Sequence, residues 1–315
     1  MQRAVRLVAI LCAVASVGTV RGQVRAPSDP VALARLFDYD GKAPMDVQGQ
    51  VVAERGGVTI HDITYASPVS GRVPAYLVVP TGPGPFAPIL FGHWGEGVRT
   101  EFLGEAVRYA RAGAVCLLPA YPWVRPAEWR RPVNRFDKPD EDRQTYIQAV
   151  VDLRRGIDVL FEQRGVDRTR LGYVGHSYGA QWGAILTAVD RRIKAAVLVA
   201  GVPDLDCVFM RDDPDIVAFR TSLPAGQLET YLKAQSVLSA VNYVSRSAPT
   251  PLLFQFSAFE RNFERDAMER HYAAASQPKR VLWYDTGHEV LDAQAIADRG
   301  SFLATQLGLK VKPVS

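Results

Sequence analysis

Short apolar runs alternate with segments of helical periodicity along this chain, from about residue 56 onward. A continuous apolar run is typical of a buried strand, and apolar side chains that recur every three or four residues indicate a helix. We expect strands at Val58–Tyr65, Val73–Val79, Pro88–Phe91, Ala114–Leu118, Leu171–Val174, Ile193–Val199, Leu252–Phe256 and Val281–Tyr284. Between the first two runs, Pro-Val-Ser-Gly predicts a hairpin turn.

The clearest helix begins near Asp140. Its apolar residues lie on one face, whereas Arg154, Arg155 and Asp158 turn elsewhere. The apolar set is Ile147, Val150, Leu153, Ile157 and Leu160. Further helices are expected at 101–112, 180–188 and 291–307. A hairpin followed by alternating strands and helices predicts an α/β fold, with a mostly parallel central sheet and helices on both faces.

The chain divides into three parts in this interpretation: residues 1–22, a lead-in segment at 23–55, and one α/β domain at 56–315. The lead-in segment contains prolines and acids, and we expect it to lie over the surface of the domain. Residues 203–249 are too long for a simple connection, which predicts a small cap insertion. Its amphipathic stretch, Leu228–Val244, is a candidate roof for a pocket.

Residues 1–22 have the features of a secretory signal peptide. Arg3 and Arg6 precede the uncharged apolar run Leu7–Val20, and cleavage is expected before Gln23. The run is shorter than the roughly 20 residues that span a bilayer, so we expect export to the periplasm or the medium without stable membrane insertion. Cys116 and Cys207 then remain, and both are expected to be free thiols.

Composition supports a globular protein. Of the 315 residues, 48 % are hydrophobic and 22 % are charged, which excludes a disordered, collagen-like or disulfide-scaffold chain. The formal net charge is +4, and removing the three arginines of residues 1–22 lowers it to +1. We therefore expect no nucleic-acid partner.

The sequence Gly-His-Ser-Tyr-Gly at residues 175–179 lies between a predicted strand and a helix of small residues. A sharp strand-to-helix turn holds its serine in a strained conformation with an exposed Oγ, and the helix N-terminus directs N–H groups at developing negative charge. Ser177 is therefore the candidate nucleophile.

A serine nucleophile needs a base. Of the five histidines, His288 is the one that follows the last predicted strand, where a loop can return to the end of the sheet that carries Ser177. A carboxylate between Ser177 and His288 would orient the imidazole. Glu260 is the first after the strand Leu252–Phe256, and we expect it in that role; Asp204 and Asp206, after the preceding strand, remain open as alternatives.

The tetrahedral intermediate of acyl transfer needs two N–H donors. One is expected from the backbone of Tyr178. The other is expected from the glycine-rich loop at 92–97, with Gly95 the first choice and Trp94 the second. We expect His93 to brace this loop rather than to transfer protons.

The loop at 121–139 is rich in aromatic residues and arginines and follows a strand end. Trp123, Arg125 and Trp129 are the candidate substrate-binding residues here. The alternative is a surface loop whose tryptophans pack down and whose arginines pair with nearby acids. We see no metal-binding or nucleotide-binding motif, so no cofactor is expected.

These motifs resemble the α/β-hydrolase superfamily over roughly residues 56–310. The resemblance rests on the His-Trp-Gly loop at 93–95, the Gly-His-Ser-Tyr-Gly turn, an acid after a late strand, and the final Gly-His. It is greatest to the branch of dienelactone hydrolases, prolyl oligopeptidases and acetyl xylan esterases. The chain has Ser177 where dienelactone hydrolases use cysteine, and Glu260 where most relatives have aspartate.

We therefore expect an exported serine hydrolase that cleaves small carboxylic esters through Ser177, His288 and Glu260 and an acyl-enzyme intermediate. A compact serine peptidase, a thioesterase, and a non-catalytic binding protein on the same scaffold are the alternatives. The sequence leaves the acyl chain, the alcohol and the oligomeric state open.

Overall fold

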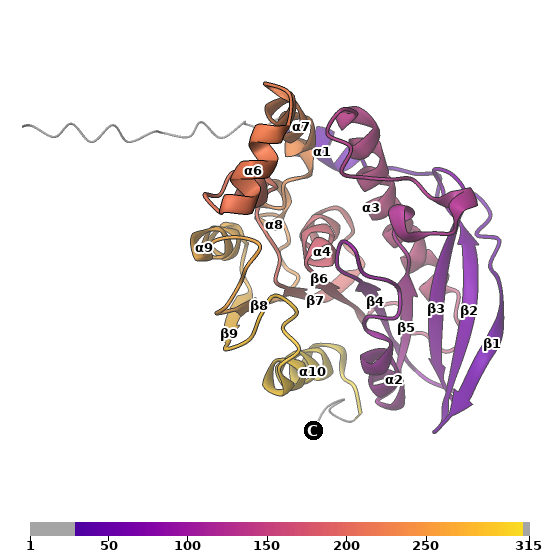
Figure 1. The fold of residues 1–315 in the computed structure, drawn as a ribbon. Coiled ribbons are helices and arrows are strands. Elements are labelled where there is room, and N and C mark those ends of the chain that lie inside the picture. Colours follow the sequence, from indigo (N-terminus) through magenta and orange to yellow (C-terminus); the bar gives the residue numbers. More distant parts are fainter. Residues whose placement is uncertain (1–28, 311–315) are drawn as a thin grey trace, which may run out of the picture.

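A nine-stranded sheet crosses the computed structural model, which describes residues 29–310 (Figure 1). The strand order is β1-β2-β3-β5-β4-β6-β7-β8-β9, and the six strands from β4 to β9 run parallel to their neighbours within that group. The strands are β1 (Gln48–Arg55), β2 (Val58–Ala66), β3 (Arg72–Pro80), β4 (Ala87–Gly92), β5 (Ala114–Pro119), β6 (Leu171–His176), β7 (Ile193–Val199), β8 (Leu252–Ser257) and β9 (Lys279–Tyr284). β2 and β3 form the predicted hairpin.

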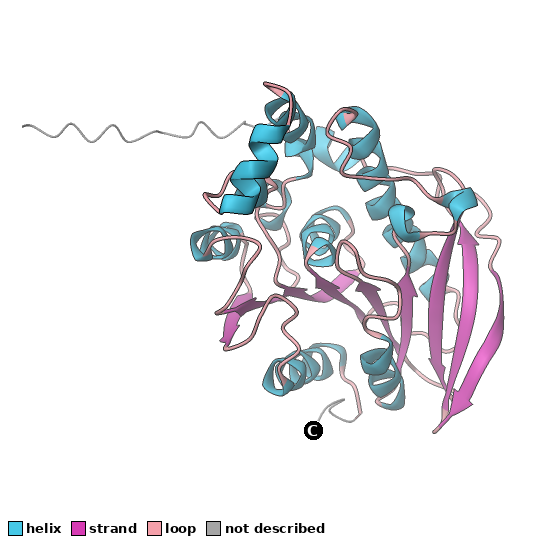
Figure 2. Ribbon diagram, in the orientation of Figure 1, coloured by secondary structure: helices cyan, strands magenta, loops and turns pink. Residues whose placement is uncertain are grey.

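Helices cover both faces of this sheet, as predicted (Figure 2). α2 and α10 pack on one face, and α3, α4, α8 and α9 pack on the other, so the sheet separates two apolar cores. The α-helices are α1 (Pro30–Arg35), α2 (Leu103–Arg111), α3 (Pro139–Phe161), α4 (Tyr178–Val189), α5 (Asp206–Phe209), α6 (Pro214–Ser222), α7 (Gln227–Gln235), α8 (Val241–Val244), α9 (Arg265–Ala274) and α10 (Ala293–Leu307). Three short 3₁₀ helices are η1 (Pro122–Val124), η2 (Ala127–Trp129) and η3 (Ser236–Leu238).

The continuous apolar runs form the central strands of the sheet, and helices cover both faces of these strands. Every residue of β4, β5, β6 and β8 is buried. Strands buried on both faces read as unbroken apolar sequence rather than as alternation. This is why the sequence pattern located them within one or two residues.

β1 is a strand that the sequence pattern missed. It pairs antiparallel with β2 at the edge of the sheet, and seven of its eight residues are exposed. A register shift between Val51 and Ala53 marks a bulge. A strand that buries neither face leaves no alternation of apolar and polar residues to detect.

The described part of the lead-in segment, residues 29–55, contributes side chains to the core and does not only lie over the surface. Leu33 and Phe37 are buried in the core beside α3. Arg154 donates from Nη1 to the carbonyl of Phe37 at 2.6 Å, and Arg155 donates to the carbonyls of Gly41 and Ala43. Arg155 does turn away from the apolar face of α3, but it is buried, because the lead-in segment covers it.

The cap insertion consists of short helices, α5 to α8. α7 lies against α3, where Tyr231 is buried and donates its hydroxyl to Oδ2 of Asp142 at 3.2 Å. Phe136 stacks on Tyr231 with ring centroids 4.5 Å apart. Through these contacts, the apolar side of α7 packs against α3 and against the loop that precedes α3.

Among residues 29–310, no helix is long and apolar enough to cross a membrane. The predicted signal peptide lies outside the described residues. Cys116 and Cys207 are both free, as predicted.

Two buried histidines make stability depend on pH. Burial lowers the pKa of His93 and of His271 from the ordinary 6.5 to about 4. Between these values the unfolded chain binds protons that the folded chain does not. The free energy of unfolding should therefore fall as pH drops from 6.5 towards 4, by up to about 3 kcal/mol for each histidine.

Urea unfolding at pH 7.5, 6 and 5 measures this effect. His271→Leu should flatten the decline, because it removes one of the two protons taken up on unfolding. A free energy of unfolding that stays constant over this range would contradict the prediction.

Candidate active site

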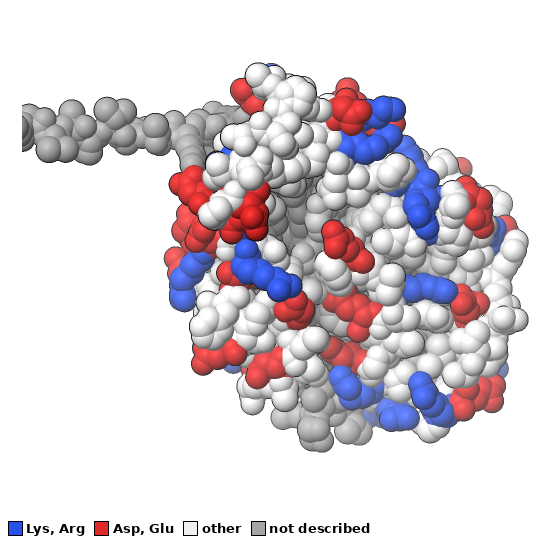
Figure 3. Space-filling view, in the orientation of Figure 1, with Lys and Arg blue, Asp and Glu red and all other residues white. Residues whose placement is uncertain are grey.

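A cavity of about 630 Å³ opens at the carboxyl ends of the central strands. The space-filling view shows the surface hollowed below α6, with acidic side chains around the hollow (Figure 3). Ser177, His288 and Trp94 line the cavity, and they follow β6, β9 and β4 respectively. In parallel sheets this end of the strands is where loops converge and ligands bind.

Ser177 occupies the turn between β6 and α4. Its backbone has φ 55° and ψ −113°, a conformation that a residue with a side chain rarely adopts. A Cβ at Gly175 would collide with the backbone of Gly179, and a Cβ at Gly179 would collide with the carbonyl of Gly92. The two glycines of the motif are therefore required by close backbone packing. This packing holds Ser177 at the floor of the cavity.

His288 and Glu260 form a buried pair beside that serine. Nδ1 of His288 lies 2.8 Å from Oε2 of Glu260, and their side chains are 7 % and 1 % exposed. The backbone N–H groups of Arg261 and Asn262 each donate to Oε1 of Glu260 at 2.9 Å, which fixes the carboxylate. Nδ1 therefore carries the proton, and Nε2 is left as a base.

The structure separates the three candidate carboxylates. Asp204 accepts the backbone N–H of Cys207 at 3.1 Å, and no hydrogen bond within residues 29–310 joins Asp204 or Asp206 to His288. Burial raises the pKa of both aspartates. Of the three, Glu260 is the carboxylate that contacts His288.

Two backbone N–H groups near Ser177 are available as donors. Those of Tyr178 and Gly95 have no acceptor among the described residues. The N–H of Trp94, in contrast, donates to Oε2 of Glu101 at 2.8 Å and is already used. The second choice for the oxyanion donor is thus excluded by this bond, whereas Gly95 and Tyr178 remain candidates.

His93 and Trp123 hold the loop that carries Gly95. Nδ1 of His93 lies 2.7 Å from the carbonyl of Trp94, and Nε2 accepts the N–H of Tyr121 at 3.2 Å. With its pKa lowered to about 4 by burial, His93 is neutral, which both bonds require. Trp123 donates its indole N–H to the carbonyl of Gly95 at 2.5 Å. Residues 92–97 are called the oxyanion loop below.

Of the three predicted substrate-binding residues, the structure places one at the cavity. Trp123 lines it, although its indole N–H is committed to the oxyanion loop. Arg125 is fully buried elsewhere and pairs with Asp152, its Nη2 lying 2.5 Å from Oδ2. Trp129 packs against Gly71 at the hairpin turn. The predictions for Arg125 and Trp129 were wrong because these two side chains turn towards α3 and the hairpin, whereas Trp123, Val133 and Asn134 of the same loop line the cavity.

The apolar wall of the cavity comes from a different part of the cap than expected. Val202, Leu205 and Val208, at and before α5, line it together with Phe263. No residue of Leu228–Val244 lines it, because that stretch packs on α3 and the core. The predicted roof is therefore a support for α5 rather than a cavity wall.

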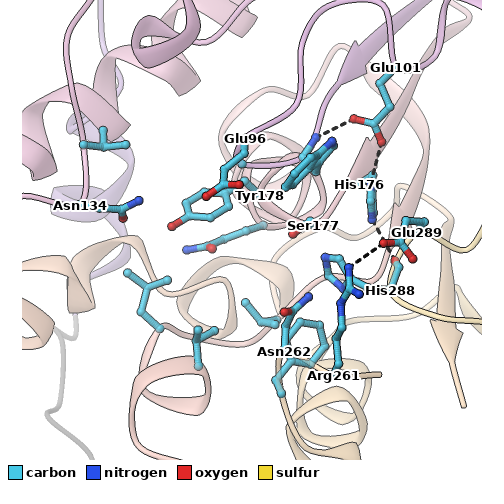
Figure 4. Close-up of a pocket in the computed structure, with 18 of the residues that line it drawn as sticks. Glu96, Glu101, Asn134, His176, Ser177, Tyr178, Arg261, Asn262, His288 and Glu289 are labelled. Atoms are coloured by element: carbon cyan, nitrogen blue, oxygen red, sulfur yellow. Dashed lines mark hydrogen bonds and ion pairs between the residues drawn. The ribbon is translucent and has the colours of Figure 1, made fainter. Parts of the chain in front are cut away.

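Sequence reasoning missed a second polar pair, Glu101 and His176. Nδ1 of His176 lies 2.6 Å from Oε1 of Glu101, and Nε2 lies 3.0 Å from the carbonyl oxygen of His288 (Figure 4). Glu101 and His176 are 75 residues apart in sequence, so no local motif signals the pair. Arg261 and Glu289 form an exposed ion pair at the rim of the same cavity.

Gly95→Ala should lower turnover without unfolding the protein. A Cβ at residue 95 would lie 2.6 Å from Cδ2 of Tyr178, so the oxyanion loop must shift. A shift of several tenths of an ångström should reduce kcat on an ester by about 10²-fold, the loss that follows removal of one oxyanion donor.

Steady-state kinetics on p-nitrophenyl acetate measures that loss. Gly104→Ala is the matched control, because nothing lies within 4 Å of a Cβ at that position in α2. It should retain full kcat. Equal activity in the two variants would show that residue 95 does not set the position of a donor.

Within the described part of the chain, no group of three or more His, Cys, Asp or Glu side chains could hold a metal ion.

No protein-family model matches this sequence, and no curated protein matches it. Solved structures do. An acetyl xylan esterase from Paenibacillus sp. R4 is similar with a TM-score of 0.70 and 21 % identity, over 88 % of this chain and 92 % of that chain. Acetyl xylan esterase 1 from Thermoanaerobacterium sp. JW/SL YS485 is similar with a TM-score of 0.72 and 14 % identity, over 91 % and 94 %.

An α/β hydrolase from Penicillium sp. sh18 is also similar, with a TM-score of 0.61 and 16 % identity, over 79 % of this chain and 99 % of that chain. These likenesses establish the α/β-hydrolase fold that the sequence motifs predicted.

Proposed function

We propose that this α/β-hydrolase fold carries a serine esterase that cleaves carboxylic esters through an acyl-enzyme. The observation that carries the proposal is that Ser177 and His288 line one cavity and that buried Glu260 contacts His288. Ser177 lies on a strained turn at the cavity floor, and the His288 ring is oriented by a buried hydrogen bond to Glu260. The names of the similar structures, which include two acetyl xylan esterases, support ester chemistry.

The reaction begins when Nε2 of His288 takes the proton of the Ser177 hydroxyl as Oγ attacks the ester carbonyl carbon. The carbonyl π electrons move to oxygen, and the N–H groups of Tyr178 and Gly95 stabilise the resulting oxyanion. The tetrahedral intermediate collapses, the bond to the alkoxy oxygen breaks, and His288 returns its proton to the departing alcohol. Water then attacks the acyl-enzyme with His288 again as base, which releases the acid and restores Ser177.

Esters are favoured over amides because the alcohol is a better leaving group. The cavity also has an apolar side made by Val202, Leu205 and Val208, which suits the acyl or alkyl part of a small ester. A thioester or a short peptide would use the same groups, and these activities remain the second choice.

Turnover of p-nitrophenyl esters of increasing acyl length tests the proposal. The expected result is turnover that ends where the chain exceeds the cavity, together with covalent labelling of Ser177 by a fluorophosphonate. Labelling of Ser177 without ester turnover would contradict the esterase and favour a serine peptidase or a thioesterase. A folded protein that neither labels nor turns over any ester would be a binding protein on a hydrolase scaffold.

We also propose that the protein is exported, on the basis of the signal-like sequence at residues 1–22. The mature protein should begin at Gln23. Intact mass measured on protein from the periplasm or culture medium tests this, and an N-terminus that retains residues 1–22 in all fractions would contradict it.

A further inference from the structure

A continuous chain of hydrogen bonds joins two loops of the site. The backbone N–H of Trp94 donates to Oε2 of Glu101 at 2.8 Å. Oε1 of Glu101 lies 2.6 Å from Nδ1 of His176, and Nε2 of His176 lies 3.0 Å from the carbonyl oxygen of His288. In Figure 4 these bonds run from Glu101 through His176 towards the histidine loop, residues 285–292.

We propose that Glu101 and His176 are positioning residues that set the oxyanion loop and the histidine loop relative to Ser177. The inference rests on the proposed function, since it assigns the pair a role in that reaction. One end of the chain holds the loop that supplies the Gly95 N–H. The other end holds the backbone of the residue that supplies the base, and His176 itself is bonded covalently to Ser177.

The protonation of the pair follows from its acceptors. The carbonyl oxygen of His288 can only accept, so Nε2 of His176 carries a proton. Nδ1 faces a carboxylate, so one further proton lies between Nδ1 and Glu101. The chain is complete only with that proton present, because a bare Nδ1 lone pair and an ionised carboxylate would repel each other.

Burial fixes the centre of this chain. His176 is 3 % exposed, so water cannot easily replace its bond to the carbonyl of His288, whereas the bond between Trp94 and Glu101 lies at the exposed end of the chain. Each end of the chain is a backbone group, and therefore loss of the middle would release whole loop segments rather than single side chains. Misplacement of reacting groups by about 1 Å lowers rates by about 10²-fold.

The positioning role and a merely structural role differ in the effect of Glu101→Gln. A glutamine can accept the Trp94 N–H through its oxygen and donate through its nitrogen to Nδ1 of a neutral His176. The hydrogen-bond chain would then survive without its charge. Glu101→Ala removes the middle of the chain, and His176→Ala removes the connection to His288.

Kinetics on p-nitrophenyl acetate tests the proposal. Glu101→Ala and His176→Ala should each lower kcat by about 10–100-fold with KM within about twofold, and Glu101→Gln should retain kcat within about threefold. The double alanine variant should lose no more than either single variant, because both break one chain. Asp190→Ala is the matched control: Asp190 is a buried carboxylate paired with Arg154 and Arg192 before β7, and its loss should lower the melting temperature but leave kcat unchanged.

Proton NMR separates failure of this inference from failure of the proposed function. The hydrogen shared by His176 and Glu101 should give a downfield resonance in the intact protein and in Ser177→Ala, and the signal should vanish in Glu101→Ala. Histidine ring signals of His288 should move in Glu101→Ala and stay in place in Glu101→Gln, with no substrate needed.

If the protein shows these NMR signals but turns over no ester, the proposed esterase function is rejected and the inference about Glu101 and His176 stands. Glu101→Ala with unchanged kcat and unchanged His288 signals would overturn the pair. So would a Glu101→Gln variant as impaired as Glu101→Ala, because the charge and not the hydrogen-bond chain would then be the active feature.

Discussion

Ser177→Ala should lower kcat on p-nitrophenyl acetate by about 10⁴-fold or more, to the residual rate that the oxyanion donors and substrate binding support without a nucleophile. In the proposed reaction the hydroxyl oxygen of Ser177 forms the bond to the acyl carbon, and alanine has no atom that can replace it. The oxyanion donors and the cavity remain in the variant, so KM should change little. Removing Oγ also removes a rotatable group from a strained turn and should leave the fold intact.

Ser247→Ala is the matched control for that measurement. Ser247 is fully buried and shares a hydrogen bond of 2.7 Å with Thr187, away from the cavity. It should keep full kcat and lose some stability. Residual turnover above a hundredth of the wild type in highly purified Ser177→Ala would show that another group attacks the ester.

Glu260→Gln should lower kcat by roughly 10³–10⁴-fold with the protein still folded. An amide that donates its N–H₂ to Nδ1 of His288 forces the ring proton onto Nε2, which must be free to act as base. The backbone donors of Arg261 and Asn262 would still hold the amide oxygen, so the side chain should keep its position. The loss therefore reports the wrong tautomer rather than a displaced loop.

Asp204→Asn and Asp206→Asn are the controls for Glu260→Gln. Neither aspartate contacts His288, so both variants should keep kcat within about twofold on the same ester. A severe loss in Asp204→Asn with a mild loss in Glu260→Gln would reverse the assignment of the acid. Measurement of kcat from pH 6 to 9 would show whether the loss recovers at any pH.

The sequence predicted the parts of the fold whose residues are buried on both sides. β7 agrees with its predicted bounds residue for residue, and the hairpin strands differ by at most one residue at either end. β1 was missed because its exposed residues carry no pattern. Of the cap helices, α5 and α8 have only four residues each, α6 buries none of its residues, and all but the first residue of α7 lies inside the amphipathic stretch Leu228–Val244. Propensity and periodicity have little to act on in such segments.

The site was predictable where chain order and strand ends fix a position. Ser177, Glu260 and His288 each follow a strand that sequence pattern located, and parallel strands bring their carboxyl ends to one edge. Arg125 was placed wrongly because the composition of a loop does not say which face it covers, and its partner Asp152 lies on α3. The Glu101–His176 pair could be found only from the structure, because no sequence motif links two residues that lie 75 positions apart.

The anchoring of the lead-in segment has a consequence for the time course of synthesis. Its carbonyl acceptors at Phe37 and Ala43 precede their donors, Arg154 and Arg155, by 117 and 112 residues. A ribosome therefore needs on the order of ten seconds between making the segment and making the arginines that bind it. During that interval the side chains of Leu33 and Phe37 have no core to enter, so this apolar segment stays exposed on the unfolded chain until α3 has been made.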